Sequence, residues 1–228
     1  MYEQVVKEIA SKVIEKKRYS SPICVGIDGI DAAGKTSLAD ELAEFLTKTG
    51  HSIIRASIDG FHHPRQIRHL RGSNSPEGYY FDSFNYELLK KCLLDPLAPD
   101  GNRMYRLQAF DFKTDTEIQA EELRASNDHI LLFDGVFLMR REIEHYWGLK
   151  IFVDIDLKTS IKRALERDLD LFGSKEEIQK RYQARYIPGQ KLYFELESPK
   201  EKADIIVNNN DFTKPLITTH GNLSKSAR

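Results

Sequence analysis

A glycine-rich segment at residues 29–36 reads GIDAAGKT and matches the whole pattern G-x-x-x-x-G-K-[ST]. The glycines of such a loop let successive backbone N–H groups turn inward around phosphate at the start of a helix. Lys35 can then reach the β- and γ-phosphates, and the Thr36 hydroxyl can ligate Mg²⁺. A chance match in an ordinary strand-to-helix turn is the alternative. We expect a site for ATP with Mg²⁺, and its predicted residues are Gly29, Asp31, Ala32, Ala33, Gly34, Lys35, Thr36 and Ser37.

Two aspartates follow apolar stretches that are typical of buried strands. Asp134 comes directly after Ile130–Phe133, which suits a carboxylate on the metal side of a phosphate loop. Asp59 follows Ser52–Ile58 and would lie beside the γ-phosphate if its strand neighbours that of the loop, where it could accept a proton from a hydroxyl. Aspartate at a strand end also serves turns, so both residues have a structural alternative. Thr36 and Asp134 are the predicted metal ligands.

The stretch Gly60–Pro76 carries three arginines and no acidic residue. Arg65, Arg68 and Arg71 are three residues apart, and such a cationic segment would stabilise an anionic ligand. The arginines could equally pair with acidic loops of the protein itself. The histidines of this stretch have no second cluster of Cys or His at zinc spacing, so a solvated loop is expected rather than a zinc site. Arg65, Arg68 and His62 are predicted substrate contacts.

A charged helical stretch at residues 161–191 places arginines on shared helix faces. Arg163 and Arg167 are four residues apart, and Arg181 and Arg185 repeat this spacing. Arginines on a mobile helical pair could close over a transferring phosphoryl group and exclude water. A solvated helix face is the alternative for each of them. We interpret the stretch as a helical lid.

The composition limits the classes of partner. The 228 residues contain 34 Lys and Arg against 35 Asp and Glu, so the net charge of −1 does not indicate a bulk nucleic-acid or membrane binder. No apolar stretch approaches the length of a membrane span, and the first residues do not have the pattern of a signal peptide. We expect a cytoplasmic protein that acts on a small molecule, without nucleic acid or membrane as partner, and we leave a homo-oligomer open.

Short apolar runs alternate with helical patterns along the chain. Strands are expected at Ile23–Ile27, Ser52–Ile58, His129–Phe133, Leu149–Ile155 and Asp204–Val207, and helices at residues 5–18 and Lys35–Thr49. This alternation predicts an α/β fold, a three-layer sandwich with a central parallel sheet of about five strands and helices on both faces. Ligands of such sheets bind at the carboxyl ends of the strands.

Residues 60–82 and 95–116 show neither pattern clearly. Irregular segments of this length in a compact domain are usually lids or binding loops, and we interpret them as the substrate loops. Residues 213–228 show no periodicity, so we expect a flexible tail there. The predicted organisation is a single P-loop domain at residues 1–212 followed by that tail.

Several segments together resemble the uridine kinase, phosphoribulokinase and pantothenate kinase group of P-loop kinases, over residues 23–209. They read GIDGIDAAGKTSLA at 26–39, SIDGFHHPR at 57–65, FDSFNYELL at 81–89 and ILLFDGVFL at 130–138. RALERDLDLFG from Arg163 and KRYQARYIPGQKLYFE from Lys180 resemble the lid arginines and the following helix. The resemblance implies the P-loop NTPase fold, Asp59 as catalytic base, and Arg163 and Arg167 as lid residues that steady the phosphoryl group.

The resemblance to uridine kinases is weaker at the positions that select the acceptor. Uridine kinases carry an Asp and a His at positions that align with Tyr79 and Phe110, which counts against uridine itself. Tyr105 aligns with a tyrosine of those kinases. The lid reads LFGS at 171–174 where uridine kinases have further arginines, and the DGF-x-x-P pattern at 59–64 is closer to pantothenate kinases and uridine kinase-like proteins. Tyr79, Tyr105 and Phe110 complete the predicted acceptor contacts.

These observations predict an ATP-dependent, uridine kinase-like phosphotransferase that moves the γ-phosphoryl group to an alcohol of a small metabolite. Lys35 and Thr36 would hold the phosphates while Asp59 positions the acceptor. A nucleoside such as uridine is the first expectation, and pantothenate, a glycerate-like acid or a sugar phosphate is the alternative. A regulatory ATPase without an acceptor is an alternative of another class, which would leave Asp59 without a role. A guanine-reading N-K-x-D motif is absent, which disfavours a GTPase.

Overall fold

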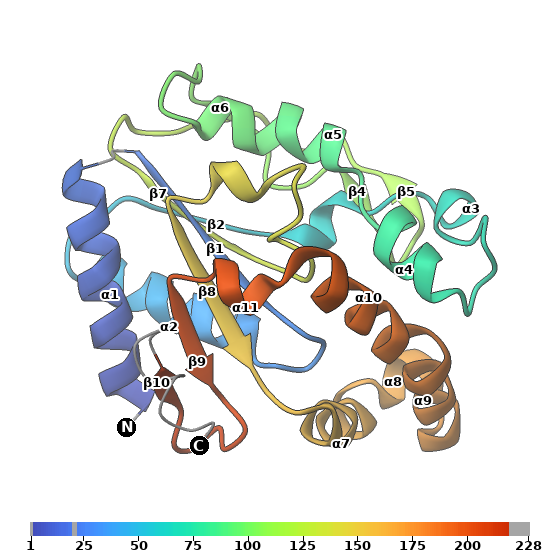
Figure 1. Cartoon of the computed structure of the whole chain (residues 1–228). Coiled ribbons are helices and arrows are strands. Elements are labelled where there is room, and N and C mark those ends of the chain that lie inside the picture. Colours follow the sequence, from blue (N-terminus) through green and yellow to red (C-terminus); the bar gives the residue numbers. More distant parts are fainter. Residues whose placement is uncertain (1, 20–21, 219–228) are drawn as a thin grey trace.

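The computed structural model describes residues 2–19 and 22–218, and its centre is a six-stranded sheet (Figure 1). The strands are β1 Ile23–Gly29, β2 Ile53–Ser57, β7 Ile130–Asp134, β8 Leu149–Asp154, β9 Ile205–Asn208 and β10 Leu216–Thr218. Their order is β10-β9-β8-β1-β7-β2. All neighbouring pairs from β9 to β2 are parallel, as predicted, while β10 runs antiparallel to β9.

Strand β10 corrects two predictions. The sheet has a sixth strand that is not parallel, and this strand lies inside residues 213–228, where we expected a flexible tail. Leu216 pairs with Asn208 and Thr218 with Ile206, so backbone pairing at the sheet edge orders these residues. A three-residue edge strand has too few residues to show an alternating pattern. Residues 219–228 of the predicted tail lie outside the described residues.

Helices cover both faces of the sheet, and alternate residues of β7 show why. Ile130 and Leu132 belong to the core on the face of α1 and α2, whereas Leu131 and Phe133 belong to the core on the opposite face. The predicted three-layer sandwich is confirmed. None of the helices in the described part of the chain is long and apolar enough to cross a membrane. The main covering helices are α1 Tyr2–Tyr19 and α2 Lys35–Lys48 on one face, with α4 Pro76–Asp82, α5 Tyr86–Leu89 and α10 Ile187–Glu197 on the other.

The two segments expected to be irregular contain short elements. Ser75 caps α4 by accepting from the Gly78 N–H at 3.0 Å, and Pro76 occupies the first turn, a start signal that the sequence does carry. In the second segment, β3 pairs with β6 and β4 with β5 as two small antiparallel ribbons. The elements are η1 Ile58–Phe61, α3 Arg65–Arg68, η2 Lys90–Leu94, α6 Asp95–Leu97, β3 Met104–Tyr105, β4 Phe110–Asp111, β5 Thr116–Glu117 and β6 Leu123–Arg124.

Residues 161–191 are helical, as expected for the lid. Gly173 has a φ of 80° and lets the chain turn from α8 into α9. A small core of Ala164, Ile178 and Tyr182 holds these helices together, and Figure 1 shows them grouped beyond the end of α10. The elements are α7 Leu157–Arg167, α8 Leu169–Phe172, α9 Lys175–Arg181 and η4 Tyr182–Tyr186, while η3 Glu144–Tyr146 and α11 Pro199–Lys202 flank the sheet.

Candidate active site

The phosphate loop joins β1 to α2, and its two outer glycines occupy positions where a side chain would collide. A Cβ on Gly29 would lie 2.4 Å from the carbonyl oxygen of Val153. Gly34 has a φ of 93°, and a Cβ there would lie 2.6 Å from Nδ2 of Asn209. The loop can therefore approach its neighbours only with glycine at both positions. Its N–H groups gather at the N-terminus of α2, where phosphate binding is favoured.

Lys35 opens α2 and is buried beneath the loop. Its Nζ donates a hydrogen bond of 2.7 Å to the carbonyl oxygen of Ile30. Burial lowers the pKa of Lys35, and the nearby carboxylates of Asp31, Asp28 and Asp134 oppose this shift. The side chain thus places one positive charge inside the loop, as phosphate binding requires.

Thr36 and Asp134 form the candidate metal site. The Thr36 hydroxyl donates to Oδ2 of Asp134 at 2.7 Å, and the other carboxylate oxygen lies 2.8 Å from Nη2 of Arg55. Parallel pairing of β1 with β7 places Asp134 opposite Ile27, just before the loop begins. A hydroxyl and a carboxylate supply hard oxygen ligands, which Mg²⁺ prefers together with phosphate oxygens. The residues present therefore fit Mg²⁺.

Asp59 lies in η1, just beyond the end of β2, and β2 pairs with β7, whose last residue is Asp134. The Asp59 side chain is 64% exposed, and its Oδ1 lies 3.6 Å from Nε2 of His62. Desolvation raises the pKa of Asp59, but its interaction with His62 outweighs this, helped by the charges of Lys35 and Arg167. The pKa stays below its ordinary value, so the carboxylate is charged at neutral pH and able to accept a proton.

His62 was predicted as a substrate contact, and the structure places it behind Asp59. Its Nδ1 lies 3.1 Å from the carbonyl oxygen of Ser83. The ring stacks on Phe84 and packs against Phe112, with centroid distances of 4.5 and 5.1 Å. These contacts hold the imidazole in place beside the Asp59 carboxylate.

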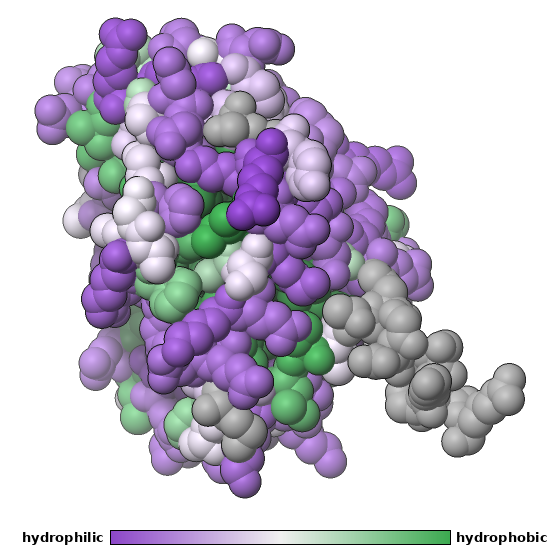
Figure 2. All heavy atoms as spheres, turned by 90° about the vertical axis from the view of Figure 1, so that its left-hand side faces the viewer, coloured by the Kyte–Doolittle hydropathy of each residue, from purple (hydrophilic) through white to green (hydrophobic). Residues whose placement is uncertain are grey.

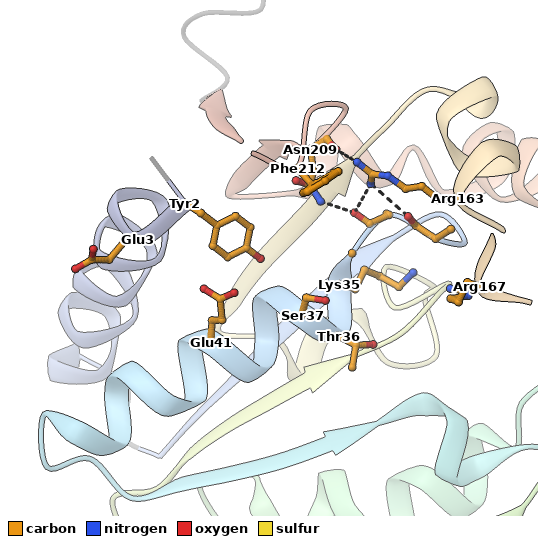
Figure 3. Close-up of a pocket in the computed structure, with 13 residues that line it drawn as sticks. Tyr2, Glu3, Lys35, Thr36, Ser37, Glu41, Arg163, Arg167, Asn209 and Phe212 are labelled. Atoms are coloured by element: carbon orange, nitrogen blue, oxygen red, sulfur yellow. Dashed lines mark hydrogen bonds between the residues drawn. The ribbon is translucent and has the colours of Figure 1, made fainter. Parts of the chain in front are cut away.

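A first cavity of about 660 Å³ opens over the phosphate loop (Figure 3). Phe212 is 67% exposed, and the guanidinium carbon of Arg163 lies 5.9 Å from the centre of its ring. Figure 3 shows Phe212 and Asn209 on one side of this space and Tyr2 with Glu41 on the other. The lining residues are Tyr2, Glu3, Ala32, Ala33, Gly34, Lys35, Thr36, Ser37, Glu41, Arg163, Arg167, Asn209 and Phe212. Six of the eight predicted ATP contacts are among them, whereas Gly29 and Asp31 are not.

The two predicted lid arginines lie at the first cavity in different settings. Arg163 donates from Nη2 to the carbonyl oxygen of Asn209 at 2.7 Å and from Nη1 to that of Ala32 at 3.4 Å, so it links the phosphate loop to the loop after β9. Arg167 pairs with Asp168 at 2.6 Å while its side chain stays 56% exposed. Nη2 of Arg167 also donates to Asp168, at 3.0 Å, so this guanidinium is held by one carboxylate and not by the phosphate loop.

A second cavity of about 600 Å³ adjoins the first at Thr36. Its wall brings together Asp59, Asp134 and Phe110, which the sequence singled out, with residues that it did not. Six of the latter come from residues 107–118, in or next to the ribbon of β4 and β5, whose pattern was too short to predict. The lining residues are Thr36, Asp40, Arg55, Ala56, Ser57, Asp59, Gly60, Leu107, Gln108, Phe110, Asp111, Phe112, Lys113, Ile118 and Asp134.

The other predicted acceptor contacts line neither cavity. The Tyr79 hydroxyl donates to Oδ2 of Asp31 at 2.7 Å, and Tyr105 is buried in the core. Arg68 pairs with Asp115 at 2.9 Å, and the backbone N–H of Arg65 donates to the same carboxylate at 2.8 Å. Arg71 likewise pairs with Asp82. Of the two open alternatives for these arginines, the structure favours pairing of Arg68 and Arg71 with the protein's own acids.

The arrangement of loop, lysine, hydroxyl and carboxylates can be compared with known families. The family model described as "Phosphoribulokinase / Uridine kinase family" matches residues 24–213. The chain belongs to this family. Helix α1, which contributes Tyr2 and Glu3 to the first cavity, lies before the matched region, whereas the phosphate loop, the second cavity and the lid lie inside it.

Known relatives agree in sequence and fold. The chain is 26% identical over 220 residues to a uridine-cytidine kinase A of Dictyostelium discoideum, with 93% of this chain but only 42% of that protein covered. It is also 26% identical to a uridine kinase of Lactobacillus johnsonii, with 87% and 93% covered. A solved structure described as a possible uridine kinase from Bacillus stearothermophilus shares the fold, with a TM-score of 0.71, 22% identity, and 90% and 99% of the two chains covered.

Proposed function

We propose that this protein is an ATP-dependent kinase that transfers the γ-phosphoryl group of ATP to an alcohol of a small metabolite. The observation that carries the proposal is the position of Asp59 in a cavity that adjoins the phosphate-loop cavity at Thr36. A nucleotide bound in the first cavity would direct its last phosphate toward a hydroxyl held in the second. Transfer of this kind depends on positioning and charge neutralisation, which the two cavities supply.

The first cavity is proposed to hold the ATP. Backbone N–H groups and Lys35 would surround the phosphates, and Thr36 with Asp134 would hold Mg²⁺, which neutralises charge on the phosphate oxygens when bound. Phe212 offers an exposed ring for stacking of the base. Arg167 lies where it can approach the phosphates as the lid closes over them.

The second cavity favours an acceptor without a negative charge. Four carboxylates line it, Asp40, Asp59, Asp111 and Asp134, against the two cations Arg55 and Lys113. This balance would repel a carboxylate or phosphate on the acceptor. The rings of Phe110 and Phe112 and the side chains of Leu107 and Ile118 supply apolar area for a base. We therefore keep a nucleoside such as uridine as the first candidate and place pantothenate, glycerate-like acids and sugar phosphates behind it.

The test is a coupled assay of ADP release with ATP and Mg²⁺ over uridine, cytidine, adenosine, pantothenate, glycerate and ribose 5-phosphate. Saturable stimulation by a nucleoside, with a phosphorylated product found by mass spectrometry, is the expected result. Stimulation by an anionic acceptor alone would contradict the assignment of the acceptor class. ADP release that no acceptor changes would favour a regulatory ATPase instead. Cytoplasmic location and self-association stay predictions from the sequence.

A further inference from the structure

Arg55 lies on β2, and its guanidinium is held between two carboxylates. Nη2 lies 2.8 Å from Oδ1 of Asp134, and Nε donates to Oδ1 of Asp40 at 2.8 Å. Nη1 donates to the carbonyl oxygen of Ala56 at 2.6 Å. The side chain is only 23% exposed. Since each of its three nitrogens has a partner, the positive charge of Arg55 is fixed in position.

One carboxylate thereby serves two partners. Oδ2 of Asp134 accepts from the Thr36 hydroxyl, while Oδ1 faces Arg55. The Asp134 side chain is 3% exposed, so water screens the neighbouring charges weakly. A cation held by Thr36 and Asp134 would share this carboxylate with a permanent positive charge.

We propose that Arg55 is a positioning residue that makes divalent-cation binding at Thr36 and Asp134 depend on bound nucleotide. Without nucleotide, Arg55, which Asp134 shares with Asp40, offsets part of the charge of Asp134 and weakens the attraction for a free cation. The phosphates of a nucleotide supply the missing negative charge, so cation and nucleotide bind together. Arg55 also determines which oxygen of Asp134 faces Thr36. This inference rests on the nucleotide site of the proposed function.

The experiment measures Mn²⁺ binding to nucleotide-free protein by electron paramagnetic resonance, with Mn²⁺ in place of Mg²⁺. Arg55→Met removes the charge and keeps an unbranched side chain, and the Kd for Mn²⁺ is expected to fall at least tenfold because a positive charge beside the site is lost. Arg55→Lys keeps the charge and is expected to stay close to wild type. Equal Kd values for wild type and Arg55→Met would overturn the inference.

Two control variants test whether the change in Mn²⁺ affinity arises at Asp134. Arg68→Met makes the same change at an arginine that pairs with Asp115 outside both cavities, and its Kd for Mn²⁺ is expected to equal that of wild type. The double variant Arg55→Met/Asp134→Asn is expected to lose the gain, and a gain that survives would place the effect elsewhere and overturn the inference. If Arg55→Met is unfolded by circular dichroism, Arg55→Gln removes the same charge and retains polar contacts.

The ADP affinity supplies a second readout, because two ligands that favour each other's binding do so by the same factor. Calorimetric titration gives the ADP affinity with and without Mn²⁺, and the ratio of the two affinities is the coupling between nucleotide and cation. Arg55→Met is expected to reduce this ratio at least tenfold, and an unchanged ratio would contradict the inference. Because the Mn²⁺ titration needs no acceptor and no turnover, its failure is distinguishable from failure of the kinase assay.

Discussion

The two cavities that meet at Thr36 are built in different ways. Six of the thirteen residues around the first cavity follow one another from Ala32 to Ser37, whereas the second cavity draws on α2, β2, η1, the β4 and β5 ribbon and β7. A phosphate is recognised by backbone N–H groups, which one continuous loop can supply. An acceptor is recognised by side chains that only the tertiary structure brings together. The nucleotide side is therefore local in the sequence, and the acceptor side is not.

A large effect is expected on the nucleotide side. Lys35→Ala removes the buried charge inside the phosphate loop, so kcat is expected to fall about 10²- to 10³-fold and ATP to bind more weakly. Lys48→Ala, at the other end of α2, is the matched control and is expected to leave both quantities unchanged. Wild-type kcat in Lys35→Ala, measured by coupled ADP release, would contradict the assignment of the first cavity.

Asp28 offers a test of the buried support beneath the loop. The carboxylate accepts from the Gly29 N–H at 2.7 Å and from the Tyr193 hydroxyl, and burial raises its pKa from 3.8 to about 6. The folded state therefore binds this proton more tightly than the unfolded state. The contribution to stability is complete below pH 4 and is lost as the pH rises through 6.

Asp28→Asn removes this dependence. The difference in free energy of unfolding between Asp28→Asn and wild type is expected to rise by about 2 kcal/mol between pH 4 and pH 7. Urea unfolding across that range measures the difference. Asp211→Asn, at an exposed carboxylate, is not expected to show this gain. Parallel curves for Asp28→Asn and wild type would show that Asp28 does not titrate in this range.

A smaller effect is expected on the acceptor side. Phe112→Ala removes an aromatic wall of the second cavity, so the KM for the acceptor is expected to rise about tenfold, as for other truncated apolar contacts, with the KM for ATP unchanged. Phe81→Ala, at a phenylalanine outside both cavities, is the matched control. An equal rise in both KM values would mean that the two cavities do not divide the substrates as proposed. A fall in kcat would indicate that Phe112 acts through His62.

Much of the fold could be predicted because its signals are local. The five parallel strands are short apolar runs, and the P-loop pattern places a strand before it and a helix after it. The sequence did not reveal β10 or the ribbons at residues 104–124, since strands of two or three residues carry no period. The helix α4 was missed although Ser75 and Pro76 mark its start.

The residues of the candidate site were likewise predictable only where their signals are local in the sequence. Lys35, Thr36, Asp59 and Asp134 could be named because each follows a strand at one sheet edge. Asn209 and Phe212 enter the first cavity from far along the chain, and only the position of β9 beside β8 brings them there. Arg55 could not be recognised as a site residue from the sequence, because its two carboxylate partners lie on other elements. Tyr79 and Tyr105 came from alignment alone, which does not show which way a side chain points.

The central claim is that Asp59, in the second cavity, acts on an acceptor while the first cavity holds ATP by itself. The most direct measurement compares Asp59→Asn with wild type in two assays, equilibrium binding of ATP and single-turnover transfer to the acceptor found in the panel. Asp128→Asn, at an exposed carboxylate outside both cavities, is the control. The account predicts unchanged ATP affinity and transfer slower by about 10²- to 10⁴-fold in Asp59→Asn alone. Near wild-type transfer by Asp59→Asn would contradict it.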